Sequence, residues 1–293
     1  MIDLHVGRGT SRGAITVFPL WSATPAPAGT SVQYTADPRH LDVRELADGP
    51  QVSLLDVGNT ASRPALVLGG QLFEGGWQHR MARRSTLIAA GERQQVEVAC
   101  VEAGRWSGES AQRSLGRRAT PLVRDAVRTG RDVQSEVWGR VARHTGRLPG
   151  AGNETGSLVR HLDASELDRA ALVPDVLPLP GQVGVLIGLG GQPYLAEVFD
   201  SPDTLAVQLP ALLAAVAADA ALAPQVPTPG RRARRFVGRA LPLELRETGP
   251  AGVGTRCEAA HEHVVAEALR HLDRDLHLLL TNPRHPLLTR PMA

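Results

Sequence analysis

The sequence predicts an α+β fold in which a β-rich N-terminal half is followed by a half of mixed helices and hairpins. Three observations lead to this class: short apolar runs between turn residues up to residue 107, valines at helical spacing after residue 130, and an apolar hairpin around Gly190-Gly191. The 293 residues are enough for one large domain or two ordinary ones. We therefore expect a β-rich region over 1–107 and a helical and α/β region over 108–293, packed together as one compact unit.

The strands of the first region are short and closely spaced. Apolar runs predict strands at 14–21, 51–57 and 64–68, and the alternating run 94–101 predicts another. Asp37-Pro38 predicts the start of one helical turn through Leu46. Because few helical stretches separate these strands, we expect a sandwich-like or roll-like sheet.

The second region begins with a helix and continues with a hairpin. Val133, Val137 and Val141 recur at i, i+4 and i+8, which predicts one apolar face of a helix. Apolar strands over 183–189 and 194–199 flank two glycines, which is typical of a tight β-hairpin.

Helices and a last hairpin complete the second region. Ser201 before Pro202 predicts a helix start, because serine caps helices well and proline suits their first position. The run 231–239 predicts a short basic helix. The alternating runs 263–272 and 276–281 predict a final hairpin.

The composition is that of a globular protein, and it predicts reduced cysteines and a cytoplasmic location. Hydrophobic residues make up 42% and charged residues 21% of the chain, which are globular values. We find no apolar run of eighteen residues and no apolar signal core, so we expect no membrane and a cytoplasmic location. The two cysteines, Cys100 and Cys257, are too few for a disulfide framework, and we expect both to be reduced.

Positive charge is concentrated in the middle of the chain. All 32 basic residues are Arg, and residues 79–147 hold 14 of them against 7 acidic residues, although the whole chain carries only +2. Such a segment suits an anionic partner. A solvated helical face explains it as well and is the simpler interpretation. The charge does not exclude nucleic acid as a partner, and a homo-oligomer is also compatible with the sequence.

The stretch 69–106 contains the densest group of candidate functional residues. Two Gly-Gly pairs frame residues 71–74, and glycine's freedom at positive φ predicts a tight hairpin or bulge. The strand that follows places Val98, Cys100 and Glu102 on one face, so that a carboxylate continues an apolar surface. The candidates are Glu74 and Glu102 as catalytic residues and Gln78, Arg80, Arg105, Trp106 and Asp200 as ligand-binding residues.

Two interpretations of the 69–106 candidates remain open. In the first, Arg80 and Arg105 grip a phosphate or carboxylate, Trp106 stacks on a base, and Glu74 or Glu102 is a general base. In the second, the same side chains form a buried Arg–Glu network that joins two β-elements. The spacing alone slightly favours the second.

Asp200 lies at the junction of a strand and a helix. It follows the predicted strand 194–199 and precedes Ser201-Pro202. This position suits a residue that helps to cap the helix, and it is also a common place for an anion site. Both explanations stay open, with the cap favoured.

No metal or cofactor site is expected. Cys257, His261 and His263 would share one face of a strand, but zinc needs about four convergent ligands and one strand rarely supplies three. The glycine-rich dinucleotide motif, the phosphate loop, the zinc-protease motif and the serine-nucleophile elbow are all absent from the sequence. The sequence therefore names no cofactor and leaves open whether the protein is an enzyme.

Several blocks of the sequence resemble a known family in both content and order. They are Leu-Phe-Glu-Gly-Gly-Trp-Gln-His-Arg at 72–80, Cys-Val-Glu-Ala-Gly-Arg-Trp at 100–106, Gln134 to Trp138, the strand and Phe-Asp-Ser-Pro turn over 179–202, and His277. Together they resemble the ARG and rhodanese-phosphatase-superfamily-associated protein domain, a domain of unknown function, from roughly Ala14 to Leu280. The chain departs from the family pattern at Phe73 and Trp77.

The resemblance implies work around ADP-ribose, NAD or related nucleotides, because the family name reflects a proposed gene association with ADP-ribosylglycohydrolases. We therefore expect the protein to bind a nucleotide or ADP-ribose-like anionic ligand. If it is an enzyme, we expect it to process the same ligand. The alternative is a non-catalytic scaffold or partner-binding module in which the Glu, Arg and Trp motifs are structural. An open cleft would favour the first function, and buried, mutually paired side chains would favour the second.

Overall fold

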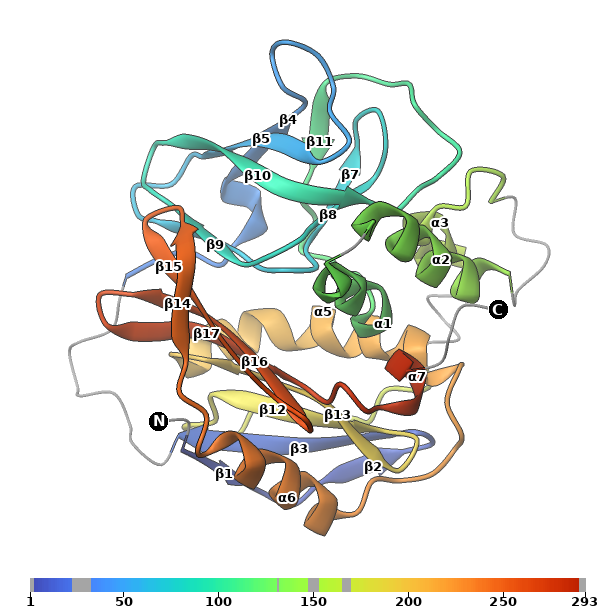
Figure 1. Ribbon diagram of the computed structural model, residues 1–293, viewed down its shortest axis with the longest axis vertical. Coiled ribbons are helices and arrows are strands. Elements are labelled where there is room, and N and C mark those ends of the chain that lie inside the picture. Colours follow the sequence, from blue (N-terminus) through green and yellow to red (C-terminus); the bar gives the residue numbers. More distant parts are fainter. Residues whose placement is uncertain (1–2, 23–32, 131, 147–152, 165–169, 290–293) are drawn as a thin grey trace. The chain divides into compact units, whose positions relative to one another are not determined.

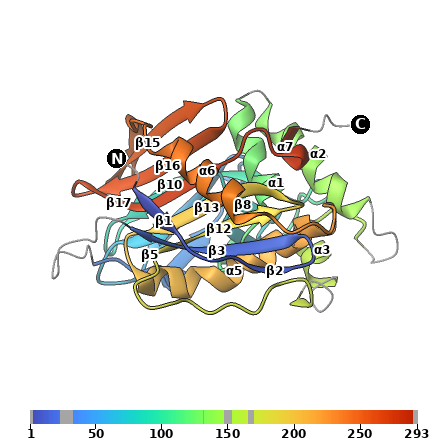
Figure 2. The ribbon, with the colours of Figure 1, turned by 90° about the horizontal axis from the view of Figure 1, so that it is seen from below.

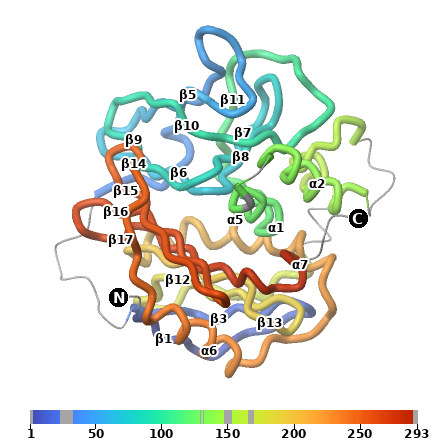
Figure 3. Tube along the Cα trace, in the orientation of Figure 1, coloured from blue at the N-terminus to red at the C-terminus, as the bar shows by residue number. Residues whose placement is uncertain are grey.

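The α+β class is confirmed, with strands dominating the first half of the chain and most helices lying in the second. The computed structural model describes residues 3–22, 33–130, 132–146, 153–164 and 170–289. Figure 1 shows its helices and strands, and Figure 3 traces the same chain as a tube.

The described chain divides into two compact units, both discontinuous in sequence. Unit 1 contains the described residues of Met1–Gln33, Ala171–Leu213 and Ala220–Pro291, and unit 2 contains those of Tyr34–Ala170 and Ala214–Asp219. The regions predicted from the sequence, 1–107 and 108–293, are each continuous. The amino-acid pattern changes at residue 107. Strands on the two sides of that position nevertheless pair with one another, so the units do not divide there.

Unit 1 is built on one antiparallel sheet of nine strands. In spatial order the path runs β1, β3, β12, β13, β17, β16, β15 and β14, and β2 pairs with β3 outside this path. The strands are β1 (Leu4–Val6), β2 (Thr10–Arg12), β3 (Ile15–Ser22), β12 (Gly184–Leu189), β13 (Gln192–Phe199), β14 (Arg246–Ala251), β15 (Gly254–His261), β16 (Val264–His271) and β17 (Arg274–Thr281). Because β3 pairs with β12, the N-terminal strands belong to the same sheet as the C-terminal hairpins.

Helix α6 (Gly230–Ala240) covers one face of this sheet. Its buried side chains are Ala233, Phe236, Val237 and Ala240, and they join a core cluster with Leu186, Leu278 and other strand residues. Figure 2 shows α6 lying across the strands. The basic helix predicted at 231–239 is therefore confirmed, and it presents its arginines on the face opposite these apolar residues.

The chain that enters unit 2 closes a barrel of six antiparallel strands. Its order is β10, β5, β4, β11, β7 and β8 (Figure 1). The strands are β4 (Leu41–Arg44), β5 (Leu54–Asn59), β7 (Leu72–Gly75), β8 (Arg80–Ala82), β10 (Arg93–Cys100) and β11 (Ala111–Arg113). A two-stranded sheet of β6 (Ala65–Val67) and β9 (Thr86–Ile88) belongs to the same unit.

Side chains of the barrel alternate between two cores. Phe73, Ala82 and Val98, from three different strands, fill one cluster inside the barrel. Met81 and Ala99, which are sequence neighbours of Ala82 and Val98, pack outward against the helices. These helices are α1 (Pro121–Arg124), the 3-10 helix Asp125–Thr129, α2 (Val133–Thr145) and α3 (Leu158–Ala164). By this alternation Arg80 and Cys100 face the barrel interior, because they stand two residues from Ala82 and Val98.

One expected helix is shorter than predicted, and two further helices complete the fold. The helical turn expected from Asp37 to Leu46 is only a three-residue 3-10 helix, Pro38–His40, because Leu41–Arg44 pairs with β5 as strand β4. The helix α5 (Pro202–Ala220) is long and apolar enough by composition to cross a membrane, and 61% of an eighteen-residue stretch of it is buried in the protein. The remaining short helix is α7 (Pro286–Thr289).

Candidate functional site at one end of the barrel

The two glycine-rich motifs meet because β8 and β10 are neighbours. Arg80 pairs with Cys100 in the antiparallel register, so Glu102 leaves β10 beside the start of β8. Gly75 and Gly76 turn the chain between β7 and β8 with φ of +97° and +56°, a region that favours glycine. Arg80 and Glu102 therefore come from adjacent segments of the barrel, Arg80 at the start of β8 and Glu102 just after the end of β10.

Glu102 is held by a complete set of donors. Its carboxylate is fully buried, and Oε2 accepts hydrogen bonds from Arg105 Nε at 3.0 Å and Nη2 at 2.7 Å. The backbone N–H of His79 donates to the same oxygen at 3.1 Å, and the Thr155 hydroxyl donates to Oε1 at 2.7 Å. Both carboxylate oxygens are therefore engaged inside the protein.

Every N–H group of the Arg105 guanidinium donates to a neighbouring residue at this end of the barrel. Besides its two bonds to Glu102, Nη1 donates to the carbonyl oxygens of Gly76 at 2.6 Å and Ser107 at 2.9 Å, and Nη2 donates to that of Gly75 at 3.2 Å. These five contacts match the five N–H donors of an arginine side chain. Arg105 thus joins the glycine turn after β7 to the end of β10.

Arg80 is fully buried inside the mouth of the barrel. Its Nη1 donates to the Gln78 carbonyl oxygen at 3.0 Å, and Nη2 lies 3.8 Å from Glu45 Oε1. Its guanidinium carbon lies 5.4 Å from the centre of the Trp106 ring, a cation–π distance. Among the described residues, Nε of Arg80 has no hydrogen-bond partner.

Gln78 and Glu45 complete the polar lining of this mouth. Gln78 Nε2 donates to the Glu102 carbonyl oxygen at 2.9 Å, and its Oε1 lies 2.8 Å from Cys100 Sγ. Glu45 Oε1 accepts from the Trp77 backbone N–H at 3.2 Å and from Gln112 Nε2 at 3.0 Å. The buried polar groups are therefore tied to backbone from several strands, which fixes the barrel end.

Glu74 lies in a separate ion pair on the same unit. Arg117 Nε donates to its Oε1 at 2.7 Å, and Arg117 Nη2 bonds its other oxygen. Arg117 also bonds Asp163 of α3. These carboxylates raise the pKa of Arg117 above its ordinary value, the hydrogen bond to Glu74 contributing most. Glu74 thus helps to tie β7 to α3 and does not join Glu102.

Trp106 is the most exposed member of the cluster. Its side chain is 44% exposed, and its ring meets that of Trp77 edge-on at 5.6 Å. Its ring lies over the Arg80 guanidinium, and its exposed part faces solvent. This is the part of the cluster that a partner can reach.

Burial and hydrogen bonds shift the titration of three groups. Burial works to raise the pKa of Glu102, but hydrogen bonds from Arg105, Thr155 and the His79 backbone outweigh it, so the pKa lies below its ordinary value. Burial lowers the pKa of His79, and its Nδ1 accepts the Gly75 N–H at 3.0 Å, so the neutral ring carries its proton on Nε2. Burial also raises the pKa of the Cys100 thiol to about 11, which leaves it unsuited to nucleophilic attack.

Asp200 belongs to unit 1, whereas the other candidate residues belong to unit 2. It is half-buried after β13, and its backbone N–H donates to the Leu276 carbonyl oxygen at 3.2 Å. The helix cap at this point comes from Ser201, whose hydroxyl accepts the Thr204 N–H at 3.2 Å. The role of Asp200 as a ligand-binding residue stays a prediction.

The described residues contain no group of three or more His, Cys, Asp or Glu side chains arranged to hold a metal ion. Cys257 is buried in the core under α6, while His261 is exposed. The strand Gly254–His261 also ends before His263. The rings of His261 and His263 lie 5.9 Å apart, but Cys257 is in the core and does not join them.

The partners of the candidate residues were not apparent from the sequence. Thr155 and Arg117 reach Glu102 and Glu74 from segments 53 and 43 residues away. Glu45 lies 32 residues before Trp77 and carries no motif. A search for buried acids opposite the two arginines would have required the barrel register, which single-sequence patterns do not supply.

A protein-family model matches residues 3–281, nearly the whole chain, and describes the ARG and Rhodanese-Phosphatase-superfamily-associated Protein domain. The chain belongs to this family. Comparisons with curated proteins and with solved structures give no match.

The family blocks noted in the sequence have visible structural roles. Gln134 on α2 bonds both backbone groups of Cys100 at 2.9 Å, and Val137 is fully buried beside β10. In unit 1, His277 Nε2 lies 2.8 Å from Glu197 Oε1, and its ring stacks on Phe199 at 5.2 Å. These family residues therefore connect elements within each unit.

Proposed function

We propose that the protein is a non-catalytic binding module, in which the Glu, Arg and Trp residues at the barrel end are structural and shape a surface around Trp106. This corresponds to the second of the two functions that the sequence left open. Binding or processing of a nucleotide or ADP-ribose-like ligand at the same residues is the competing hypothesis.

The observation that carries the proposal is the saturation of Arg105. A guanidinium that binds a ligand phosphate needs at least one free donor, and all five donors of Arg105 already have partners. Releasing the bonds to Glu102 or to the Gly75 and Gly76 carbonyl oxygens would leave a buried or part-buried acceptor without its donor, which costs about 1–3 kcal/mol for each group, whereas water can replace the bond to the exposed Ser107 carbonyl oxygen.

The carboxylates support the same proposal. A general base must reach the proton that it removes, within about 3 Å or through one water. Glu102 is fully buried with both oxygens bonded, and Glu74 is bonded at both oxygens by Arg117. The lowered pKa of Glu102 also favours a permanent charge over proton exchange near neutral pH.

The exposed Trp106 gives the module a surface that suits binding. Tryptophan is enriched among the residues that dominate protein interfaces. The edge-on contact with Trp77 and the cation–π contact with buried Arg80 hold its ring in one orientation. A rigid aromatic side chain loses little conformational entropy when a partner covers it.

The test compares Arg105→Ala with Arg113→Ala, an exposed arginine of β11 in the same unit. Removing one partner of a buried ion pair costs about 3–5 kcal/mol, so Arg105→Ala should unfold at clearly lower urea concentration, while Arg113→Ala should not. The double variant Arg105→Ala/Glu102→Gln should recover part of the loss, because it removes the unpaired charge.

Calorimetric titration of the same variants with ADP-ribose and ADP separates the two hypotheses. The structural role predicts that any nucleotide affinity of the wild type is unchanged in folded Arg105→Ala. An Arg105→Ala variant with wild-type stability and an affinity about tenfold to a hundredfold weaker would refute the proposal and support the ligand site.

A further inference from the structure

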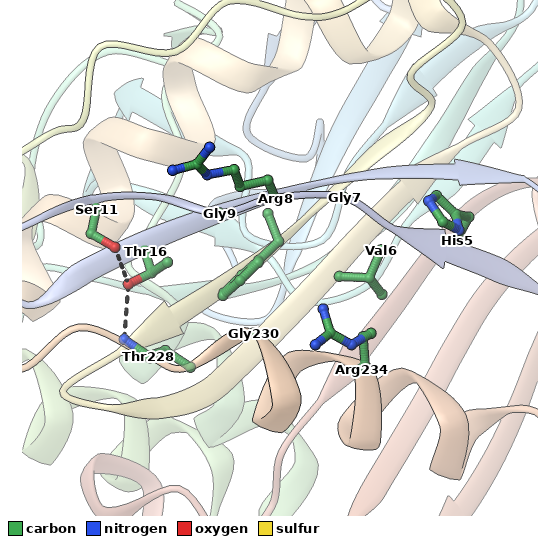
Figure 4. A pocket seen from close by; sticks show the side chains of 11 residues that line it. His5, Val6, Gly7, Arg8, Gly9, Ser11, Thr16, Thr228, Gly230 and Arg234 are labelled. Atoms are coloured by element: carbon green, nitrogen blue, oxygen red, sulfur yellow. Dashed lines mark hydrogen bonds between the residues drawn. The ribbon is translucent and has the colours of Figure 1, made fainter.

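A pocket of about 460 Å³ lies within unit 1, and none of the residues predicted as a site lines it (Figure 4). Its walls come from the segment that joins β1 to β2, from β3, and from the start of α6. This volume is in the range of small-molecule sites in proteins.

The pocket exists because the segment between β1 and β2 is Gly7-Arg8-Gly9. A Cβ on Gly9 would lie 2.5 Å from Phe18 Cε1, and one on Gly7 would lie 2.7 Å from Trp21 Cζ3. Both positions therefore need glycine so that the backbone can lie directly on these rings. The bare backbone leaves room on the side that faces α6.

The pocket is positively charged. Arg8 and Arg234 both line it, and within the described part of the chain neither forms a hydrogen bond or an ion pair through its side chain. Helix α6 carries five arginines and no acidic residue. In Figure 4 the Arg234 side chain rises from α6 toward the β1–β2 segment, so Arg234 is the cation best placed to meet a ligand.

Polar groups on the opposite wall are already organised. The hydroxyls of Ser11 and Thr16 lie 3.0 Å apart, and the Thr228 backbone N–H donates to Thr16 Oγ1 at 2.9 Å. Thr228 leads into α6, whose N-cap residue Pro229 supplies no side-chain hydrogen bond to the first turn. The partial positive charge of the helix start therefore adds to that of Arg234.

We propose that this pocket binds a small phosphate-bearing anion, with Arg234 as its principal ligand-binding residue. An arginine fork matches the oxygens of a phosphate bidentately, and hydroxyls with glycine backbone line the same space. The volume admits a group larger than phosphate alone, such as a nucleoside phosphate. The site lies in unit 1 and is independent of the function proposed for the barrel end.

The experiment titrates the full chain with inorganic phosphate, pyrophosphate and ADP, with succinate as a dicarboxylate comparison, by calorimetry at low salt. Arg234→Ala is compared with Arg235→Ala, its exposed neighbour on the same helix, which removes the same charge outside the pocket. Both side chains are exposed, so we expect both variants to fold, and thermal unfolding checks this.

We expect saturable binding of at least one phosphate probe, weakened about tenfold to a hundredfold by Arg234→Ala and less than threefold by Arg235→Ala. Arg234→Lys should recover part of the affinity, since it keeps the charge and loses the fork. The proposal is overturned if no phosphate probe binds, if both alanine variants weaken binding equally, or if succinate binds as tightly as the phosphates.

Discussion

Glu102 shows how far a single side chain in this protein depends on its neighbours. It is fully buried, yet its pKa lies below the ordinary value because Arg105, Thr155 and the His79 backbone all stabilise the charged form against the effect of burial. Each of these donors comes from a different segment. The pKa of Glu102 therefore depends on the barrel end being intact.

The first prediction is a pH dependence of stability that Glu102→Gln reduces. A carboxyl whose pKa is lower in the folded state stabilises the fold above its unfolded pKa, near 4.5, and this contribution is lost as the pH falls toward its folded pKa. The wild type should therefore lose more stability between about pH 5 and pH 3 than Glu102→Gln does.

Urea unfolding at several pH values measures this difference directly. Other acids with lowered pKa values, such as Asp37 at about 2, are present in both proteins and cancel in the comparison. Parallel curves for the two proteins over this pH range would contradict the assigned role of Glu102.

The elements that follow a local pattern are the ones that the sequence predicted well. The hairpin around Gly190-Gly191 and the helix with Val133, Val137 and Val141 need only local periodicity and turn chemistry, and both are present. Barrel closure depends on β11, three residues long, pairing with both β4 and β7. Such pairing leaves almost no pattern in sequence, so the barrel could not be predicted.

The candidate site was predicted in the same partial way. Glycines and charged residues at 69–106 indicated that Glu102, Arg105 and Arg80 lie together, because β8 and β10 are close in sequence. The partners of these residues could not be predicted, since they include Thr155, Glu45 and carbonyl oxygens from other segments. Asp200 was grouped with them for its position between a strand and a helix start, a local feature that says nothing about the barrel.

The second prediction contrasts two glycines in unit 1. Gly238 lies inside α6, is exposed, and a Cβ there would meet nothing within 4 Å, so Gly238→Ala should stabilise the protein by about 0.5–1 kcal/mol. Gly184 of β12 faces the backbone of β13, and a Cβ would lie 2.6 Å from the Glu197 carbonyl oxygen. Gly184→Ala should therefore destabilise by about 1–3 kcal/mol.

Free energies of unfolding from urea titration check both values. The pair is informative because the two substitutions add the same methyl group to elements of one unit. A loss of stability in Gly238→Ala would show that this glycine has a role that the helix does not explain.

At the scale of the whole molecule, one helix contributes residues to both units. Most of α5 belongs to unit 1, but Ala214–Asp219 belongs to unit 2. Asp219 is fully buried, accepts the Leu122 backbone N–H at 2.9 Å, and lies 3.1 Å from His144 Nε2. Unit 2 therefore depends on a residue that the chain supplies only after β12 and β13.

The third prediction follows from this dependence. Asp219→Ala should raise hydrogen exchange in α1 and α2 of unit 2, because Leu122 and His144 lose a buried partner, and leave β16 and β17 little changed. Asp203→Ala, an exposed acid in the first turn of the same helix, is the matched control.

Hydrogen-exchange mass spectrometry resolves these elements as separate peptides. Equal loss of protection throughout the chain would mean that the two units unfold as one, and it would remove the basis for treating Asp219 as a residue of unit 2. Loss confined to β16 and β17 would contradict the prediction outright.

The pairing of β3 with β12 has a consequence for the protein during its synthesis. Leu20 and Gly184 are partners in that register, so a ribosome must add every residue between them before the pair can form. At typical elongation rates this takes roughly ten to thirty seconds. All six barrel strands emerge earlier, within the continuous stretch from Leu41 to Arg113. We expect the barrel to acquire structure on the ribosome before β12 has been synthesised. During that time the edge of β3 that pairs with β12 is unpaired, and a chaperone can bind the apolar strand β3.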